Sequence, residues 1–302
     1  MIKRLFRITP MSWFVILAVV AVVVALGMPP DPHTLTELHT SATAYRAAVF
    51  VLLIPYAIIW YCGFYAFAKL REYASYIKKT REGYAFRQLS LGMGVLAFGL
   101  VVPTIISQLL NGITRMHPGF VTAQTIIDNY ITIIVAVAAL TFLSNGSHAL
   151  AATGKLRMSL RGVRILAVLF ILVSTVYTWL VFHNHHTYET YRLATGWLIV
   201  TFIAPYLYAW FAGLACAFEL QFYAMHTAGL LYWSVLKQFA AGLTVVVLGS
   251  IAIQFVASSL PTSLRSSLGP VLLIDYALIL TVAIGLIIIA VSTKKLKRIE
   301  EV

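Results

Sequence analysis

The chain has 302 residues, of which 61% are hydrophobic and 11% are charged, and its formal net charge is +12. An ordinary soluble domain is about 45–50% apolar and about 25% charged, so this chain has more apolar surface than one water-soluble core can bury. The composition therefore excludes a soluble enzyme and a disordered chain, and two cysteines are too few for a disulfide-stapled secreted domain. It predicts a multi-pass membrane protein in contact with a lipid bilayer.

Eight apolar segments are long enough to cross a bilayer, because a spanning helix needs about 20 predominantly apolar residues. In chain order they are 11–28, 46–68, 89–110, 121–143, 162–182, 194–217, 238–258 and 270–292. The first segment follows a basic stretch, as in a signal peptide, but its apolar run is longer than the usual run of about 7–15 residues. We therefore expect an all-α polytopic membrane protein with eight transmembrane helices.

Positive charges alternate between the two sides of this expected bundle. The amino terminus, the second, fourth and sixth connections and the tail hold 18 of the 22 Lys and Arg residues. The other four are Arg46, Arg115, Arg192 and Arg265. Cytoplasmic segments are enriched in Lys and Arg, so this pattern predicts cytoplasmic amino and carboxyl termini in the cell membrane (plasma or inner). A nucleic-acid-binding protein would instead gather its cations on one soluble face, so no nucleic-acid partner is expected.

Two stretches of the chain, 53–74 and 203–224, are similar to each other at an offset of 150 residues. The shared residues include Pro55/Pro205, Tyr56/Tyr206, Trp60/Trp210, Gly63/Gly213 and Leu70/Leu220, and the match continues through Gln88/Gln238. After a three-residue slip, Ile127-Asp128 aligns with Ile274-Asp275. We therefore expect two parallel four-helix repeats, 1–150 and 151–302, related by a pseudo-two-fold axis along the membrane normal. The oligomeric state stays open.

The repeat-matched residues have both a structural and a functional interpretation. Pro55 and Pro205, beside Trp60 and Trp210, mark either a hinge or kinks tolerated within membrane helices. Gly63 and Gly213 favour close helix packing. Gln88 and Gln238, at the entry of the third and seventh spans, make hydrogen bonds between helices or line a gate.

Asp128 and Asp275 are the only acids placed inside spans, since the other eight lie in loops, tails or span ends. A charge in the membrane is costly and is therefore a candidate functional residue. Thr125, Asn129 and Thr132 share one helical face with Asp128, which predicts a binding site for a cation or proton. The alternative is a pair of structural carboxylates bonded to nearby arginine or tyrosine.

Three histidines in one outer loop, His183, His185 and His186, are weak candidates for binding a metal. A solvated loop is the simpler interpretation, because only one acid lies nearby. No catalytic motif is present, so an enzyme is not indicated, and no cofactor is expected. A basic cluster ends the chain and is suited to anionic lipid or to fixing topology alone: Lys294, Lys295, Lys297 and Arg298.

Two functions remain open at the level of sequence. The first is a transporter or channel for a small solute or cation, with a path between the repeats and paired intramembrane aspartates. The second is a non-transporting membrane scaffold or sensor that acts through its cytoplasmic helices 69–88 and 219–237.

Overall fold

The computed structural model describes residues 10–27, 35, 40–114, 132–151, 204–226, 233–259 and 268–296. These residues form seven helices: α2 (Pro10–Gly27), α4 (Ala42–Tyr76), α5 (Arg81–Thr114), α7 (Thr132–Ala151), α11 (Ala204–His226), α12 (Trp233–Ser259) and α14 (Leu268–Lys294). Five of them, α4, α5, α7, α12 and α14, contain stretches long and apolar enough to cross a membrane. The prediction of a helical, polytopic membrane protein is confirmed at this level. The fifth expected span, 162–182, lies outside the described residues.

Several helices run past the ends that hydropathy predicts. α4 has 35 residues and is about 50 Å long, whereas the hydrocarbon core of a bilayer is about 30 Å thick. It therefore continues beyond the apolar span 46–68 into the expected cytoplasmic extension. α7 runs to Ala151, past the predicted end of its span at residue 143, and α11 runs to His226, through the first part of the predicted cytoplasmic helix 219–237.

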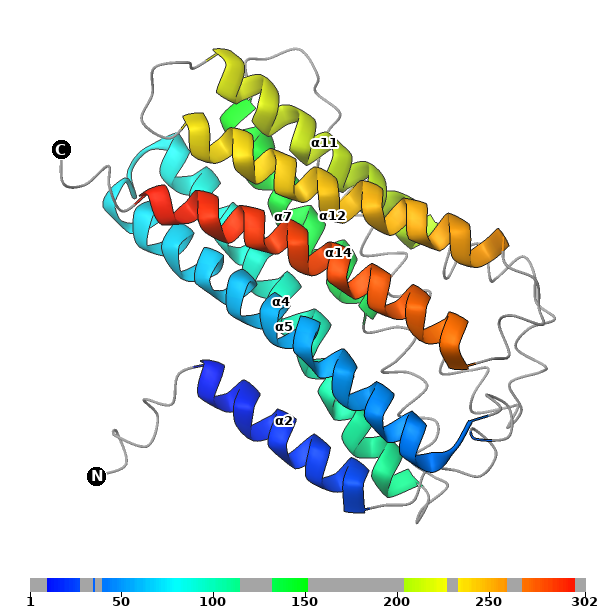
Figure 1. The fold of residues 1–302 in the computed structure, drawn as a ribbon. Helices are drawn as coiled ribbons and strands as arrows, with labels where there is room; N and C mark the ends of the chain where they lie inside the picture. Colours follow the sequence, from blue (N-terminus) through cyan, green and yellow to red (C-terminus); the bar gives the residue numbers. More distant parts are fainter. Residues whose placement is uncertain are drawn as a thin grey trace, which may run out of the picture.

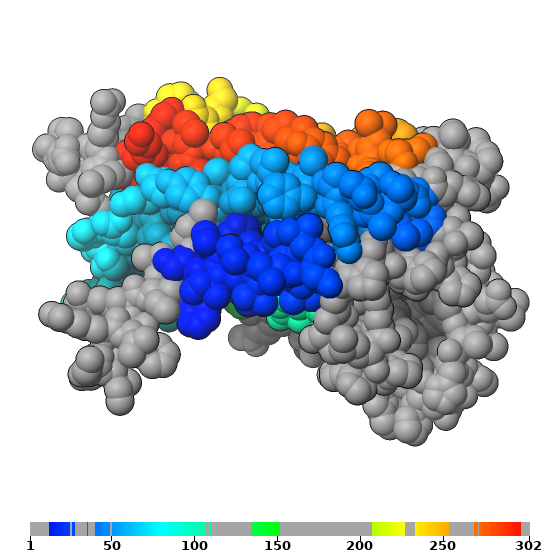
Figure 2. Space-filling view, turned by 60° about the horizontal axis from the view of Figure 1, so that its bottom comes forward, coloured from blue at the N-terminus to red at the C-terminus, as the bar shows by residue number. Residues whose placement is uncertain are grey.

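Six helices form a closed ring in which each contacts two neighbours. Going around it, α4 packs on α5, α5 on α7, α7 on α11, α11 on α12, α12 on α14, and α14 returns to α4 (Figure 1). α2 lies outside this ring, against α4 and α5, as the dark blue surface in Figure 2 shows. Its Phe14 stacks on Trp60 of α4 with ring centroids 5.5 Å apart, and Phe98 of α5 meets the same indole edge-on at 4.6 Å.

Glycines set the closest helix contacts in the ring. A Cβ atom added to Gly63 would lie 2.6 Å from the Cβ of Ala97, between α4 and α5. One added to Gly213 would lie 2.5 Å from a methyl group of Val247, between α11 and α12. Real Cβ atoms do not approach other atoms so closely, so both helix pairs require glycine at these positions. Each residue of the second pair lies 150 positions after its counterpart in the first.

The outward faces of the helices are apolar and exposed, as expected of surfaces in contact with lipid. The most exposed apolar side chains include Val23, Phe211, Phe218 and Leu273. A soluble monomer rarely exposes so many apolar residues together. Inside the ring, large apolar residues such as Phe86, Leu143, Leu220 and Phe239 form one buried cluster.

One end of the bundle gathers nearly all the described positive charge. α2 begins at this end, the α4–α5 turn lies at it, and α7, α11 and α14 finish there (Figure 1). We call it the basic end; its Lys and Arg residues are Lys69, Arg71, Lys78, Lys79, Arg81, Arg87, Lys237, Lys294 and Lys295. Among the described residues, Arg46 is the only Lys or Arg at the other end.

Candidate functional site between α7 and α11

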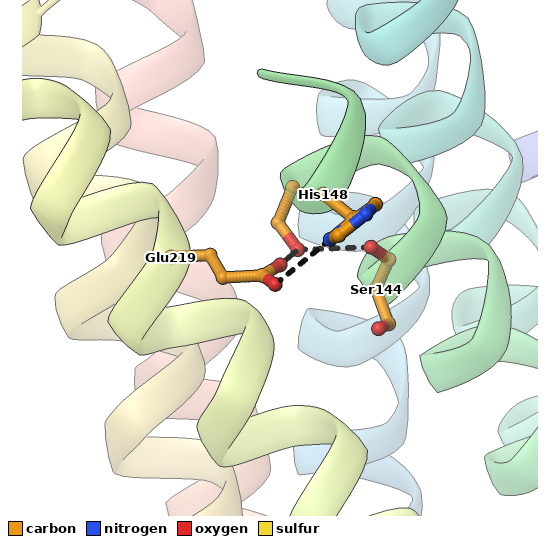
Figure 3. A network of polar contacts seen from close by, with 4 residues as sticks. Ser144, His148 and Glu219 are labelled. Atoms are coloured by element: carbon orange, nitrogen blue, oxygen red, sulfur yellow. Dashed lines mark hydrogen bonds and ion pairs between the residues drawn. The ribbon is translucent and has the colours of Figure 1, made fainter. Parts of the chain in front are cut away.

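A carboxylate and an imidazole meet where α7 packs against α11 near the basic end. Nδ1 of His148 lies 3.2 Å from Oε1 of Glu219, and the hydroxyl of Ser147 donates to Oε2 of the same carboxylate at 2.5 Å. Figure 3 shows His148 and Glu219 pointing toward each other across the interface (Figure 3). Both side chains keep partial access, with relative exposures of 29% and 26%. They are therefore only partly enclosed by the two helices.

Helix periodicity brings the α7 residues of this site together. Ser144, Ser147 and His148 fall within one turn, three and four residues apart, so their side chains share a face. Ser147 is fully buried, and its single hydroxyl proton has two acceptors, Glu219 and the carbonyl of Ser144 at 3.0 Å. A charged acceptor makes the stronger bond, so an ionised Glu219 is the favoured partner.

Cys216 precedes Glu219 by one turn of α11 and faces the same site. Its thiol is completely buried and lies within hydrogen-bonding contact of Ser147. A reactive cysteine needs access to its substrate, whereas this one is enclosed. Its small, polarizable side chain fills the space behind the Ser147–Glu219 bond.

Further polar groups continue along the same helix interface. The hydroxyls of Thr141 on α7 and Tyr208 on α11 lie 2.9 Å apart. Asn145, one turn after Thr141, is also buried, with an exposure of 7%. Thr141 to His148 spans about 10 Å of helix at 1.5 Å per residue. We call this set the polar seam: Thr141, Asn145, Ser147, His148, Tyr208 and Glu219.

The polar seam explains why α7 extends past the predicted end of its span. Ser144 to His148 lower the hydropathy of the fourth span, and Glu219 does the same for the sixth. Burying such groups is costly unless they are hydrogen-bonded. Here each helix supplies partners for the other, so both continue as regular helices.

The other contact between the two halves of the chain, α4 with α14, has a different chemistry. At an offset of 150 residues, the position of Glu219 corresponds to Lys69, which pairs with Glu72 of its own helix at 2.6 Å. On α14, Ser292 and Thr293 are fully buried and donate to carbonyls of their own helix. Of the two described interfaces between the halves, the α7–α11 interface holds the carboxylate–imidazole pair.

Most of the predicted ion-binding and metal-binding residues lie outside the described residues. Asp275 is exposed on α14, whereas Thr125, Asp128 and Asn129 lie outside the described residues. The backbone of Thr132 begins α7. His183, His185 and His186, with Lys297 and Arg298 of the tail, also fall outside that part of the chain. Within the described residues, no group of three or more His, Cys, Asp or Glu side chains is placed to hold a metal ion.

The repeat-matched residues take varied places. Pro55 lies inside an unbroken α4, and Pro205 is the second residue of α11. Gln238 accepts a hydrogen bond from the ammonium of Lys295 at 2.9 Å, which joins α12 to the end of α14. Gln88 is half-buried on α5, whereas Trp60 is almost completely buried.

The sequence held signals for the polar seam that its interpretation did not use. Sequence alone places Glu219 at the start of the predicted cytoplasmic helix 219–237, and it predicts no role for Asn145 or Ser147. The useful signal was the density of polar residues where the fourth span ends, together with one acid near the end of the sixth. No protein-family model, curated protein or solved structure matches this chain.

Proposed function

We propose that this membrane protein is a transporter or channel for a small solute or cation, with an exchange site for protons or cations in the polar seam. The observation that carries the proposal is the contact of His148 and Ser147 on α7 with Glu219 on α11. The pair lies at the cytoplasmic ends of the expected spans, and ionisable residues that face the interior of a membrane helix bundle mark ion paths and proton relays. In the proposed arrangement the basic end faces the cytoplasm.

The proposal includes two four-helix repeats with the path between them. It is supported by equivalent contacts in the two halves of the ring. Gly99 is closest to Val135, between α5 and α7, and Gly249 is closest to Thr281, between α12 and α14. The ring neighbours follow the same order in each half, and α7 with α11 is one of the two contacts between the halves. A path between the repeats would therefore include the polar seam.

These contacts favour a slightly different sequence offset between the last helices of the two repeats, 146 residues in place of the 147 that aligns Asp128 with Asp275. Thr281 follows Val135 by 146 positions, and Ile289, which approaches Gly242, follows Leu143, which approaches Gly92, by the same number. At this offset Asp275 corresponds to Asn129 rather than to Asp128. Asp275 is also exposed, so we assign the outer polar group of the path to Asp128 with Thr125, Asn129 and Thr132.

The chemistry proposed for the polar seam is a proton relay. Imidazole and carboxylate side chains form such relays in membrane transport proteins. Here Nδ1 of His148 and Oε1 of Glu219 lie within hydrogen-bonding distance. The oxygen atoms of Glu219 and Ser147 also suit a hard cation.

A scaffold or sensor is the second candidate, and one observation favours it. The extension 69–88 forms a regular helical hairpin, in which the ends of α4 and α5 are joined by the turn Ile77–Thr80. Charged side chains on this hairpin are exposed, among them Arg71, Lys78 and Lys79. Of the extension 219–237, residues 219–226 belong to α11 and 233–237 to α12.

Flux measurements on the purified protein in liposomes test the transport proposal. A pH gradient, with an internal pH-sensitive dye, reports proton flux, and the same vesicles with imposed Na⁺ or K⁺ gradients report cation flux. We expect flux above that of empty vesicles, and we expect Glu219→Gln to abolish it. Glu72→Gln is the matched control, because Glu72 is an exposed acid at the same end of the bundle.

Two results would overturn the proposal. The first is wild-type flux equal to that of empty vesicles for all three ions. The second is equal flux for the wild type and Glu219→Gln, which would leave the carboxylate a purely structural role.

A further inference from the structure

A groove opens between α4 and α5 at the basic end, away from the polar seam. Its cavity volume is about 360 Å³, within the range typical of small-molecule sites. Three cationic side chains and two hydroxyls line it, over an aromatic ring: Arg71, Lys78, Arg87, Ser75, Ser90 and Phe67. The three cations match the oxygens of a phosphate group, whereas the hydroxyl protons of Ser75 and Ser90 are already donated to backbone carbonyls.

The fold holds these groups together through a fixed turn. Arg71 and Ser75 lie one turn apart on α4, and Arg87 and Ser90 lie one turn apart on α5. Thr80 caps α5, since its hydroxyl accepts a hydrogen bond from the amide of Gly83 at 3.0 Å and donates to the carbonyl of Ile77 at 2.9 Å. This capped turn sets the distance between the end of α4 and the start of α5.

Internal contacts orient the floor of the groove. The guanidinium of Arg71 lies over the ring of Phe67, 5.7 Å from its centroid. Ser90 donates to the carbonyl of Phe67 at 2.9 Å, which ties α5 to α4. A stacked arginine keeps its planar donors free for an oxyanion, because the ring contacts only the face of the guanidinium.

The positive charge of the groove is not neutralised by the nearest acid. Glu72 follows Arg71 directly, but its carboxylate pairs with Lys69 at 2.6 Å. No ion pair joins Arg71, Lys78 or Arg87 to another acid among the described residues. An anion entering the groove would therefore meet three cations that form no ion pair with a described acid.

We infer that this groove binds a phosphate group, carried either by an anionic phospholipid headgroup or by a soluble phosphate. Its position favours the lipid source. The apolar span of α4 ends at residue 68, so Phe67 marks the expected edge of the hydrocarbon layer and Arg71 begins the headgroup level. Basic pockets between membrane helices at this level bind anionic headgroups. The inference does not depend on the transport proposal, which rests on other residues.

Binding measurements on the purified, detergent-solubilised full chain test it with two probes. Short-chain phosphatidylglycerol in mixed micelles, with phosphatidylcholine as the zwitterionic reference, tests the lipid source, and inorganic phosphate tests the soluble source. Each cation near an anionic surface changes a binding constant by about fivefold. We therefore expect Arg71→Gln with Arg87→Gln to weaken phosphatidylglycerol binding by about 25-fold.

A matched double variant controls for net charge. Lys79→Gln with Lys237→Gln removes two exposed cations at the same end but outside the groove, and it should bind as the wild type does. Arg71→Lys with Arg87→Lys should retain part of the affinity. Phosphatidylglycerol binding that depends on the two arginines supports the lipid source, and phosphate binding with the same dependence supports the soluble source. Equal loss in both double Gln variants, or no loss for either probe, would overturn the inference.

Discussion

Ser147 of α7 donates a 2.5 Å hydrogen bond to Glu219 of α11, from a position that is completely buried. This bond joins helices from the two halves of the chain, and the two residues lie 72 positions apart in sequence. Together with the His148–Glu219 and Thr141–Tyr208 contacts, it specifies which polar positions of α7 and α11 face each other. Several expectations follow from this contact and from the others described above.

Removing the Ser147 hydroxyl should destabilise the bundle. Ser147→Ala leaves one oxygen of Glu219 without its buried donor, which should cost about 1–2 kcal/mol of unfolding free energy. Ser75→Ala is the control, because the hydroxyl of Ser75 is exposed and bonds within its own helix to Glu72. Denaturant titration in detergent, followed by tryptophan fluorescence, measures both. Equal stability of the two variants would contradict a structural role for the Ser147–Glu219 bond.

Gly63 should tolerate no side chain. In Gly63→Ala the new methyl group would meet the Cβ of Ala97 at 2.6 Å, so α4 and α5 would have to separate. We expect a loss of about 1–3 kcal/mol, as for other overpacked interiors. Gly269→Ala is the matched control, since nothing lies within 4 Å of a Cβ at Gly269. Thermal unfolding should show a lower Tm for Gly63→Ala only, and a similar Tm for both variants would argue against this contact.

Gly213→Ala tests whether the second half of the chain packs as the first does. Its added methyl group would approach Val247 at 2.5 Å, at the position that corresponds to Ala97. If the halves are repeats, Gly213→Ala and Gly63→Ala should lower the Tm by similar amounts in the same thermal assay. A wild-type Tm for Gly213→Ala would count against equivalent packing.

Asp128 and Asp275 should differ in importance for flux. Asp128→Asn should abolish proton or cation flux in proteoliposomes, because Asp128 is the outer polar group of the proposed path. Asp275→Asn should reduce flux much less, since the Asp275 side chain is exposed on α14. Insertion and monodispersity of both variants provide the folding control. Greater loss in Asp275→Asn would place the path elsewhere.

The orientation of the chain can be read by labelling single cysteines in intact cells. Both native cysteines, Cys62 and Cys216, are buried and can be replaced by alanine for this purpose. A cysteine at exposed Ser75, on the basic end, should be shielded from an impermeant thiol reagent, and one at exposed Ser41, at the opposite end, should react. Reaction at Ser75 without permeabilisation would reverse the proposed orientation.

Sequence alone determined the class of protein and the approximate positions of the described helices. Transfer of an apolar segment into lipid depends on its own length and composition, so a local count of apolar residues is enough to find it. The alternation of Lys and Arg between successive connections can also be read from the sequence alone, and the basic end of the bundle follows that pattern. Gly63 and Gly213 were recognised as packing positions because glycine in a membrane helix has few other uses.

Only the tertiary structure decided which side chains meet. Whether Glu219 faces water, lipid or Ser147 depends on the rotation of α11 against α7, and packing around the whole ring sets that rotation. The same holds for the groove, where the turn at Thr80 places Arg87 opposite Arg71. Hydropathy records the cost of burying each residue alone, whereas a hydrogen bond to a neighbouring helix offsets that cost, which is why α7 runs past its predicted end.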